Sequence, residues 1–167
     1  MTDEPTFDPY ALLSALDRER VSYVVVGGFA RVVHGSAEAT DGLDVVPSLR
    51  EENLRRLGRA LDELEASQPG LEERLAAASP VTLRTSAGEL RLVAEPWGTR
   101  GYDDLRRRAV REHLGRGVRP PVASIVDCVR MLDASERKAD ADRLRRLRRL
   151  MELERQLVPH RGLGIER

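Results

Sequence analysis

The segment "YVVVGGFARVVHG", residues 23–35, constrains the fold of this chain more than any other. Its continuous apolar, β-branched start is typical of a strand buried on both faces. Gly27 and Gly28 end this strand, and a short helix stopped by Gly35 follows. A strand that turns into a helix through Gly-Gly presents free backbone N–H groups. This arrangement suits a bound phosphate, or only close packing of strand on helix. The segment therefore predicts a protein with interleaved strands and helices.

The remaining sequence continues this alternation. Apolar residues at helical spacing predict helices, and β-branched or alternating runs predict strands. Ser48 followed by Glu51 also predicts a capping box. We expect helices at 7–20, 48–65, 71–79, 102–114, 124–134 and 138–157, strands at 21–26 and 43–47, a hairpin at 81–96, and a loop or edge strand at 116–123. The order predicts an α/β (α+β) fold, in which helices cover a small mixed β-sheet.

The length of 167 residues suits one domain. We expect an α/β core over residues 1–122, a C-terminal helical portion over 123–157 packed on the same domain, and a tail over 158–167. The acidic N-terminus is unlike a signal peptide, and the longest apolar run is too short to cross a bilayer. The single cysteine suits a reducing compartment, so we expect a cytoplasmic protein with no membrane partner.

Two aspartates lie at the start of the second predicted strand, in the stretch "ATDGLDVV". Asp41 and Asp44 are three residues apart, so a regular strand would point them to opposite faces. A β-bulge at Gly42 would bring them to the same side. Carboxylates that share one face are the oxygen ligands that Mg²⁺ prefers. Whether this is an acid pair therefore depends on the local backbone.

The stretch "VVVGGFARVVHGSAEATDGLDVV" resembles the nucleotidyltransferase fold of DNA polymerase β-like enzymes. It is most similar to the small bacterial proteins of the minimal-nucleotidyltransferase and AbiEii-like toxin type. Their pattern is Gly-Gly or Gly-Ser, then His-Gly, then Arg-x-Thr-x-Asp-x-Asp, with a third acid on a later strand. The resemblance implies that Gly27, Gly28, Thr40 and His34 lie at a nucleotide site, and that an active member uses Mg²⁺ with a nucleoside triphosphate.

The sequence departs from this pattern at the metal-binding acids. Gly42 stands at the first acid position and Arg91 at the third, which leaves Asp44 alone in its place. We expect Arg91 to take the place of the metal and to pair with Asp44. Asp41 would assist Asp44 only if a metal is bound. Glu89 and Glu95, on the same strand face as Arg91, remain alternative substitutes. A further departure is Glu38, at the usual arginine position.

These departures favour a degenerate family member, a pseudoenzyme that serves as a binding or regulatory module for a nucleotide, a nucleic acid or a protein, with no cofactor. The alternative is an active Mg²⁺-dependent nucleotidyltransferase that moves a nucleotide to an RNA, protein or small-molecule acceptor, as in toxin–antitoxin systems. Its catalytic and metal-binding residues would be Asp44 and Asp41. The sequence leaves open whether the chain is an enzyme.

The last predicted helix carries many arginines, including Arg143, Arg145, Arg146, Arg148 and Arg149. Such a basic face can bind RNA, DNA or an acidic protein. Neighbouring acids make a solvated amphipathic face the simpler interpretation. Lys+Arg and Asp+Glu balance at 28 each, so no net field attracts nucleic acid. The sequence does not indicate the oligomeric state.

Overall fold

The computed structural model describes residues 5–77, 79–135 and 137–157; the predicted tail lies outside them. The helices are α1 (Pro9–Arg18), α2 (Gly27–Val33), α3 (Glu51–Glu63), α4 (Leu71–Ala76), α5 (Tyr102–Leu105), α6 (Ile125–Asp133) and α7 (Lys138–Leu157). The strands are β1 (Tyr23–Val26), β2 (Gly42–Pro47), β3 (Val81–Thr85), β4 (Gly88–Leu92), β5 (Val110–Arg111) and β6 (Pro121–Val122).

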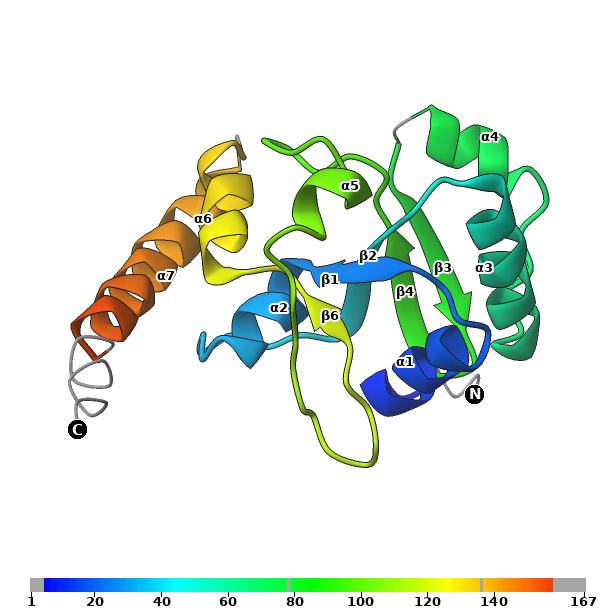
Figure 1. Cartoon of the computed structure of the whole chain (residues 1–167), viewed down its shortest axis with the longest axis horizontal. Coiled ribbons are helices and arrows are strands. Elements are labelled where there is room, and N and C mark those ends of the chain that lie inside the picture. Colours follow the sequence, from blue (N-terminus) through cyan, green and yellow to red (C-terminus); the bar gives the residue numbers. More distant parts are fainter. Residues whose placement is uncertain (1–4, 78, 136, 158–167) are drawn as a thin grey trace, which may run out of the picture.

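The strands form a single sheet in the order β3-β4-β2-β1-β6-β5. The β2–β4 and β1–β6 pairs are parallel, and the other three pairs are antiparallel. The predicted mixed sheet covered by helices is therefore confirmed (Figure 1). The predicted hairpin is also confirmed, as β3 and β4.

The alternation of side chains along β2 and β4 separates a buried face of the sheet from an open one. Leu43 lies opposite Leu90 and Val45 opposite Leu92, and all four are fully buried. They pack beneath α1 and α3, which supply further leucines to the core: Leu12, Leu13, Leu16, Leu57 and Leu61. On the open face the residues between them are polar, so the sequence that builds the core also exposes charged groups on the other side.

The C-terminal helices form a second packing unit beside the sheet. Helix α6 packs on α2 and α7 packs along α6, and Figure 1 shows this pair at the end of the molecule away from α3 and α4. Cys128 and Leu132 of α6 and Leu147 of α7 are buried in this contact. None of the helices within the described ranges is both long enough and apolar enough to cross a membrane.

The helix predicted over 102–114 is wrong. Helix α5 ends at Leu105, and Val110 pairs with Val122 across the β5–β6 ladder. The pairing of two strands and the hydrogen bond that the Tyr10 hydroxyl donates to the Leu114 carbonyl, at 2.8 Å, override the local helix propensity. The expected capping box is also absent. Arg50, not Ser48, is the residue that precedes α3.

Asn53 of α3 connects the helix to the ends of β1 and β2. Its side chain is buried and makes three hydrogen bonds. The Oδ1 atom accepts from the Ser22 N–H at 2.7 Å. The Nδ2 atom donates to the carbonyls of Ser22 at 2.9 Å and Ser48 at 2.7 Å. These bonds fix α3 against the edge of the sheet at which the chain enters β1 and leaves β2.

We expect Asn53→Ala to lower the free energy of unfolding by about 2–3 kcal/mol, because the change leaves buried backbone groups without partners. Urea denaturation followed by circular dichroism measures this loss. The control is Glu52→Ala on the same helix, whose exposed ion pair with Arg56 contributes less than about 1 kcal/mol. Equal losses in the two variants would contradict this role of Asn53.

Candidate functional site

A cleft of about 270 Å³ lies between the open face of the sheet and the α6–α7 pair. The turn from β1 into α2, strands β2 and β4, the segment after β4, and helices α6 and α7 all contribute to its lining. Its cations are Arg31, Arg91, Arg137 and Arg143, and its acids are Asp44, Glu95 and Asp140. The cleft therefore collects charged side chains from most of the length of the chain.

Gly27 and Asp44 are in close contact at the floor of this cleft. Gly27 has φ +70°, and a Cβ atom at this position would lie 2.4 Å from Oδ2 of Asp44. The positive φ and the close contact both require glycine. Gly28 also lines the cleft, as the resemblance implies for both glycines of the turn.

Asp44 and Arg91 are directly opposite each other in the parallel β2–β4 ladder, and both side chains line the cleft. Burial raises the pKa of Asp44, while the positive charges of Arg91 and Arg31 partly oppose this shift. No ion pair joins Asp44 to Arg91 in the part of the chain that the structure describes. The two therefore interact through their fields within one cleft rather than through a direct contact.

Arg31 and Glu38 form a nearly buried ion pair beside Gly28. Arg31 Nε lies 3.0 Å from Glu38 Oε2, Arg31 Nη2 lies 2.9 Å from Oε1, and the two side chains are 12% and 11% exposed. Burial opposes ionisation of Glu38, but hydrogen bonds from Arg31 and Ser36 outweigh it and lower its pKa. Glu38, which stands at the usual arginine position of the family pattern, thus fixes Arg31 at the cleft.

Asp41 does not join Asp44 in the cleft. It precedes β2 and is exposed, and the register from Gly42 onward is regular, with Gly42 opposite Glu89. The bulge that would bring the two aspartates together is therefore not formed. A different acid approaches this position: Glu89 Oε1 lies 3.7 Å from where a Cβ at Gly42 would stand.

Thr40 and His34 make structural contacts outside the lining of the cleft. The Thr40 hydroxyl donates to the Gly42 carbonyl at 3.0 Å. His34 Nε2 lies 2.7 Å from the Ala123 carbonyl, which joins the end of α2 to the segment before α6. In this structure both side chains support the elements around the cleft, and their predicted contact with a nucleotide stays a prediction.

Sequence reasoning missed the apolar wall of the cleft, which includes Trp97 and Met131. Trp97 is 52% exposed, and the Arg137 guanidinium lies 5.3 Å from the centre of its ring. An exposed tryptophan in the loop "EPWG" was the available signal. Nearby Gly98 (φ +78°) packs so closely on α6 that a Cβ would lie 2.9 Å from the Cβ of Ala134.

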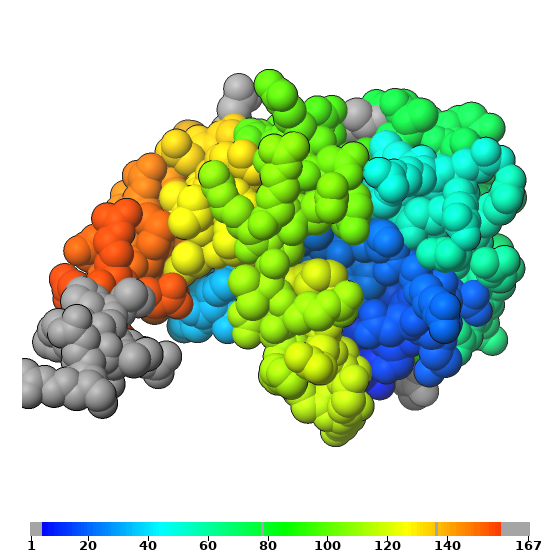
Figure 2. Space-filling view, in the orientation of Figure 1, coloured from blue at the N-terminus to red at the C-terminus, as the bar shows by residue number. Residues whose placement is uncertain are grey.

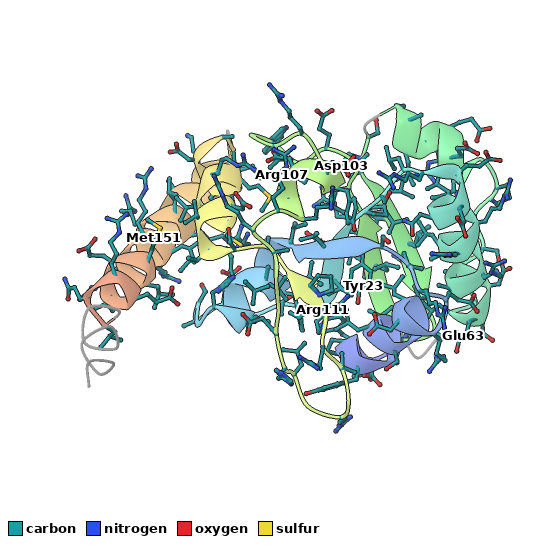
Figure 3. The ribbon with its side chains drawn as sticks, in the orientation of Figure 1. Tyr23, Glu63, Asp103, Arg107, Arg111 and Met151 are labelled. Carbon is teal, nitrogen blue, oxygen red and sulfur yellow. The ribbon has the colours of Figure 1, made fainter. Side chains whose placement is uncertain are left out.

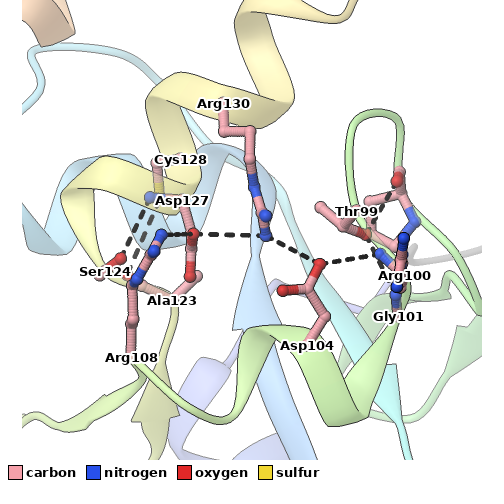
Figure 4. A network of polar contacts seen from close by, with 11 residues as sticks. Thr99, Arg100, Gly101, Asp104, Arg108, Ala123, Ser124, Asp127, Cys128 and Arg130 are labelled. Carbon is pink, nitrogen blue, oxygen red and sulfur yellow. Dashed lines mark hydrogen bonds and ion pairs between the residues drawn. The ribbon is translucent and has the colours of Figure 1, made fainter.

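A polar network holds the Trp97 loop against α6 (Figure 4). Asp104 Oδ2 accepts from the Arg100 N–H at 2.9 Å and from Arg130 Nη2 at 3.0 Å. The Arg100 bond is the main cause that lowers the pKa of Asp104. Arg130 and Arg108 both reach Asp127, at 3.3 and 3.2 Å, and Asp127 is almost fully buried. The network makes the wall part of the fold rather than a free loop.

The acids of the cleft do not match a Mg²⁺ site. Magnesium binds through carboxylate oxygens with several waters, and Asp44 is the only acid that the strand pair supplies to the cleft lining. Arg91 stands opposite Asp44, and burial disfavours the ionised form of the Asp44 carboxyl. Among the described residues, no group of three or more His, Cys, Asp or Glu side chains is placed to hold a metal.

Solved structures that resemble this chain are nucleotidyltransferases. The antibiotic-resistance factor ANT(2'')-Ia shares 12% identity at a TM-score of 0.54, over 93% of this chain and 91% of that one. The lincosamide antibiotic adenylyltransferase LnuA, solved with lincomycin, shares 14% identity at a TM-score of 0.53, over 87% of this chain and 99% of that one. TM1012 of Thermotoga maritima, assigned as a nucleotidyltransferase, shares 14% identity at a TM-score of 0.51, over 95% of this chain and 99% of that one.

These similarities and the six-stranded mixed sheet define the class of the chain by its fold, which is the nucleotidyltransferase fold. No protein-family model matches the sequence, and no curated protein sequence matches it. The identities are low, so the structural neighbours establish the fold and leave the activity and the minimal-nucleotidyltransferase or AbiEii-like subtype to proposal.

Gly27→Ala should destabilise the protein by about 1–3 kcal/mol, because it combines a strained backbone with a collision against Asp44. Gly58→Ala is the matched control. A Cβ at Gly58 meets nothing within 4 Å on the exposed side of α3, so we expect a gain of up to about 1 kcal/mol. Thermal and urea unfolding of both variants measure the difference. A neutral Gly27→Ala would show that the Asp44 side chain does not lie against the backbone of residue 27.

The raised pKa of Asp44 predicts a pH dependence of stability. The folded state holds this proton more tightly than the unfolded state, so ionisation of Asp44 costs stability as the pH rises above the ordinary carboxyl pKa of about 3.9. We expect Asn at this position (Asp44→Asn) to stabilise the protein at neutral pH, with the gain shrinking towards pH values below about 3.9.

Urea denaturation across this pH range measures the gain. The control is Asp41→Asn, an exposed change that should alter stability by less than about 0.5 kcal/mol at each pH. A loss of stability in Asp44→Asn at neutral pH would contradict the assignment, since it would mean that the carboxylate is favourably paired.

Proposed function

We propose that this chain is a nucleotide-binding module that has lost metal-dependent nucleotidyl transfer. The observation that carries the proposal is the position of Arg91 directly opposite Asp44 in the parallel β2–β4 ladder, with Gly42 at the neighbouring acid position. A permanent guanidinium occupies the side of the cleft where the fold would otherwise need a third carboxylate. We infer that the positive charge of Arg91 stands in place of a metal ion and partly offsets the negative charge of Asp44.

The charge of the cleft supports a polyphosphate as the ligand. Arg31 and Arg143 are held by acids, but Arg91 and Arg137 take part in no ion pair among the described residues. Guanidinium groups bind phosphate oxygens through parallel N–H donors. Gly28 adds no side chain of its own to the floor, which leaves its backbone open to a phosphate group beside Arg31. Trp97 offers the base a flat aromatic surface.

The structural neighbours are consistent with a nucleotide as the ligand. LnuA is an adenylyltransferase, and the fold of this chain is the same. The lincomycin in that structure is not inferred to be a ligand of this chain, because the similarity is one of fold alone. The proposal concerns the nucleotide half of such a reaction, and it assigns no acceptor.

A second candidate function is Mg²⁺-dependent nucleotidyl transfer, and one observation favours it. Glu89 leans over Gly42, at the position that the first acid of the family pattern would fill. Asp44 and Glu89 on one face would then be the carboxylates available for a metal. Glu89 also disfavours ionisation of Asp44, which places its charge close enough to act there. An acceptor for this reaction would be RNA, protein or a small molecule.

The test is a titration with ATP and GTP, followed by the fluorescence of Trp97, the only tryptophan in the chain. We expect binding that changes less than about threefold when Mg²⁺ is replaced by EDTA. Arg91→Gln should weaken binding about tenfold or more, because a charge-assisted hydrogen bond is lost. Arg84→Gln, an exposed change on β3 outside the cleft, is the control with unchanged affinity.

Asp44→Asn separates the two candidate functions. Removing a negative charge from the cleft should tighten nucleotide binding about fivefold if no metal takes part. If the chain is a transferase, labelled triphosphate with Mg²⁺ should give a labelled acceptor, and Asp44→Asn and Glu89→Gln should each abolish this product. Absence of binding for both nucleotides at millimolar concentration would refute the proposal outright.

A further inference from the structure

A second hollow lies at the opposite end of β1 from the cleft, and arginines dominate it. Two depressions, of about 700 and 240 Å³, share Ser22, Tyr102 and Arg106 and so lie side by side; together they are called the groove. The arginines that line this groove are Arg20, Arg50, Arg56, Arg106, Arg111 and Arg119. They come from the α1–β1 connection, the start of α3, and the segment between α5 and β6.

Distant parts of the sequence meet at this groove. Figure 2 shows the yellow-green segment that includes β5 beside the blue α1–β1 region and the cyan start of α3. Figure 3 shows Tyr23 and Arg111 close together there, with Asp103 and Arg107 above them. Arg111 Nη1 donates to the Arg119 carbonyl at 3.0 Å, which holds two of the arginines side by side.

Most of these guanidinium groups are available to a ligand. Arg56 is paired with Glu52 and Arg106 with Asp103. Over the described ranges of the chain, the other four arginines of the groove form no ion pair: Arg20, Arg50, Arg111 and Arg119. All four are exposed.

The acids at the groove do not cancel this charge. Three acids line it: Asp17, Glu52 and Asp103. Asp17 accepts a hydrogen bond of 2.9 Å from the hydroxyl of the buried Tyr23, and the other two are the ion-pair partners already described. Six arginines against three acids leave the groove strongly positive, although the chain as a whole is neutral.

Helix α7, which carries the densest run of arginines in the sequence, is different. Arg143, Arg145 and Arg148 are each paired with an acid of α7 or of a neighbouring element. Only part of its positive charge is therefore free for a partner. The arginines that the fold gathers from separate segments form a stronger candidate surface than those that are adjacent in the sequence.

We propose that this groove binds the backbone of a single-stranded nucleic acid. Its two adjoining depressions and its exposed guanidinium groups, spread over both, suit successive phosphates along a strand rather than one compact anion. Tyr102 lines both depressions and is half-buried, which places an aromatic ring beside these groups to stack on a base. This site is separate from the nucleotide cleft and does not depend on the function proposed for it.

The test is a fluorescence-anisotropy titration of the full chain with a labelled 20-nucleotide single-stranded RNA of mixed sequence, at several KCl concentrations. Contact with about four phosphates predicts that log K falls with log [KCl] with a slope of about −3. The variant Arg20→Gln/Arg111→Gln/Arg119→Gln should bind at least about tenfold more weakly at low salt, with a slope shallower by about 2.

The matched control is Arg145→Gln/Arg146→Gln/Arg149→Gln, which removes the same charge from exposed positions of α7. We expect its affinity to stay within about twofold of the wild type. Should loss of the Arg111–Arg119 hydrogen bond unfold the groove variant, Arg20→Gln/Arg119→Gln keeps that bond and should still lose several-fold in affinity. Circular dichroism establishes that each variant is folded.

Three results would overturn the proposal. The first is no RNA binding by the wild-type chain at about 50 mM KCl, a low salt concentration at which phosphate contacts are strong. The second is an equal loss of affinity in the α7 variant and the groove variant. The third is displacement of the RNA by polyglutamate as effectively as by unlabelled RNA, which would identify the groove as a site for an acidic protein.

Discussion

The parallel register between β2 and β4 is the constraint on which the rest of this structure depends. It places Leu43 against Leu90 and Val45 against Leu92 in the core, and this fixes Asp44 opposite Arg91 on the open face. A shift by one residue would bury both charges and expose the leucines. The hydrophobic core therefore enforces the polar arrangement of the cleft, without a direct bond between the two charged side chains.

Sequence alone predicted the parts of the fold that local patterns determine. The β-branched run before Gly27 and the alternating hairpin gave correct strands, and strand periodicity placed Asp44 and Arg91 on one side. The helix predicted through Leu114 failed, because pairing between residues distant in the chain outweighs local propensity. The absence of an ion pair between Asp44 and Arg91 in the described part of the chain, and the Trp97 wall, depend on how side chains, loops and helices pack, which no local pattern reports.

Arginine use illustrates the same limit. Two of the adjacent arginines of α7, Arg143 and Arg145, pair with acids one turn away, as expected for an exposed helix, and Arg148 pairs with Asp133 of α6. Six arginines from Arg20 to Arg119 meet in space at the groove, and only Arg56 and Arg106 of these have an acid partner among the described residues. The balance of 28 basic and 28 acidic residues conceals this unevenness. Charge counted along a sequence and charge gathered on a surface are therefore different quantities.

Strand β1 is only four residues long and is buried throughout, yet it supports both surfaces. Tyr23 and Val24 line the arginine groove, while Val26 begins the lining of the cleft, about 10 Å away along the strand. The strand is a short buried link between the two proposed binding surfaces, one at each of its ends. A substitution in this strand therefore affects both surfaces together, whereas residues of α4 and of the far end of α7 line neither.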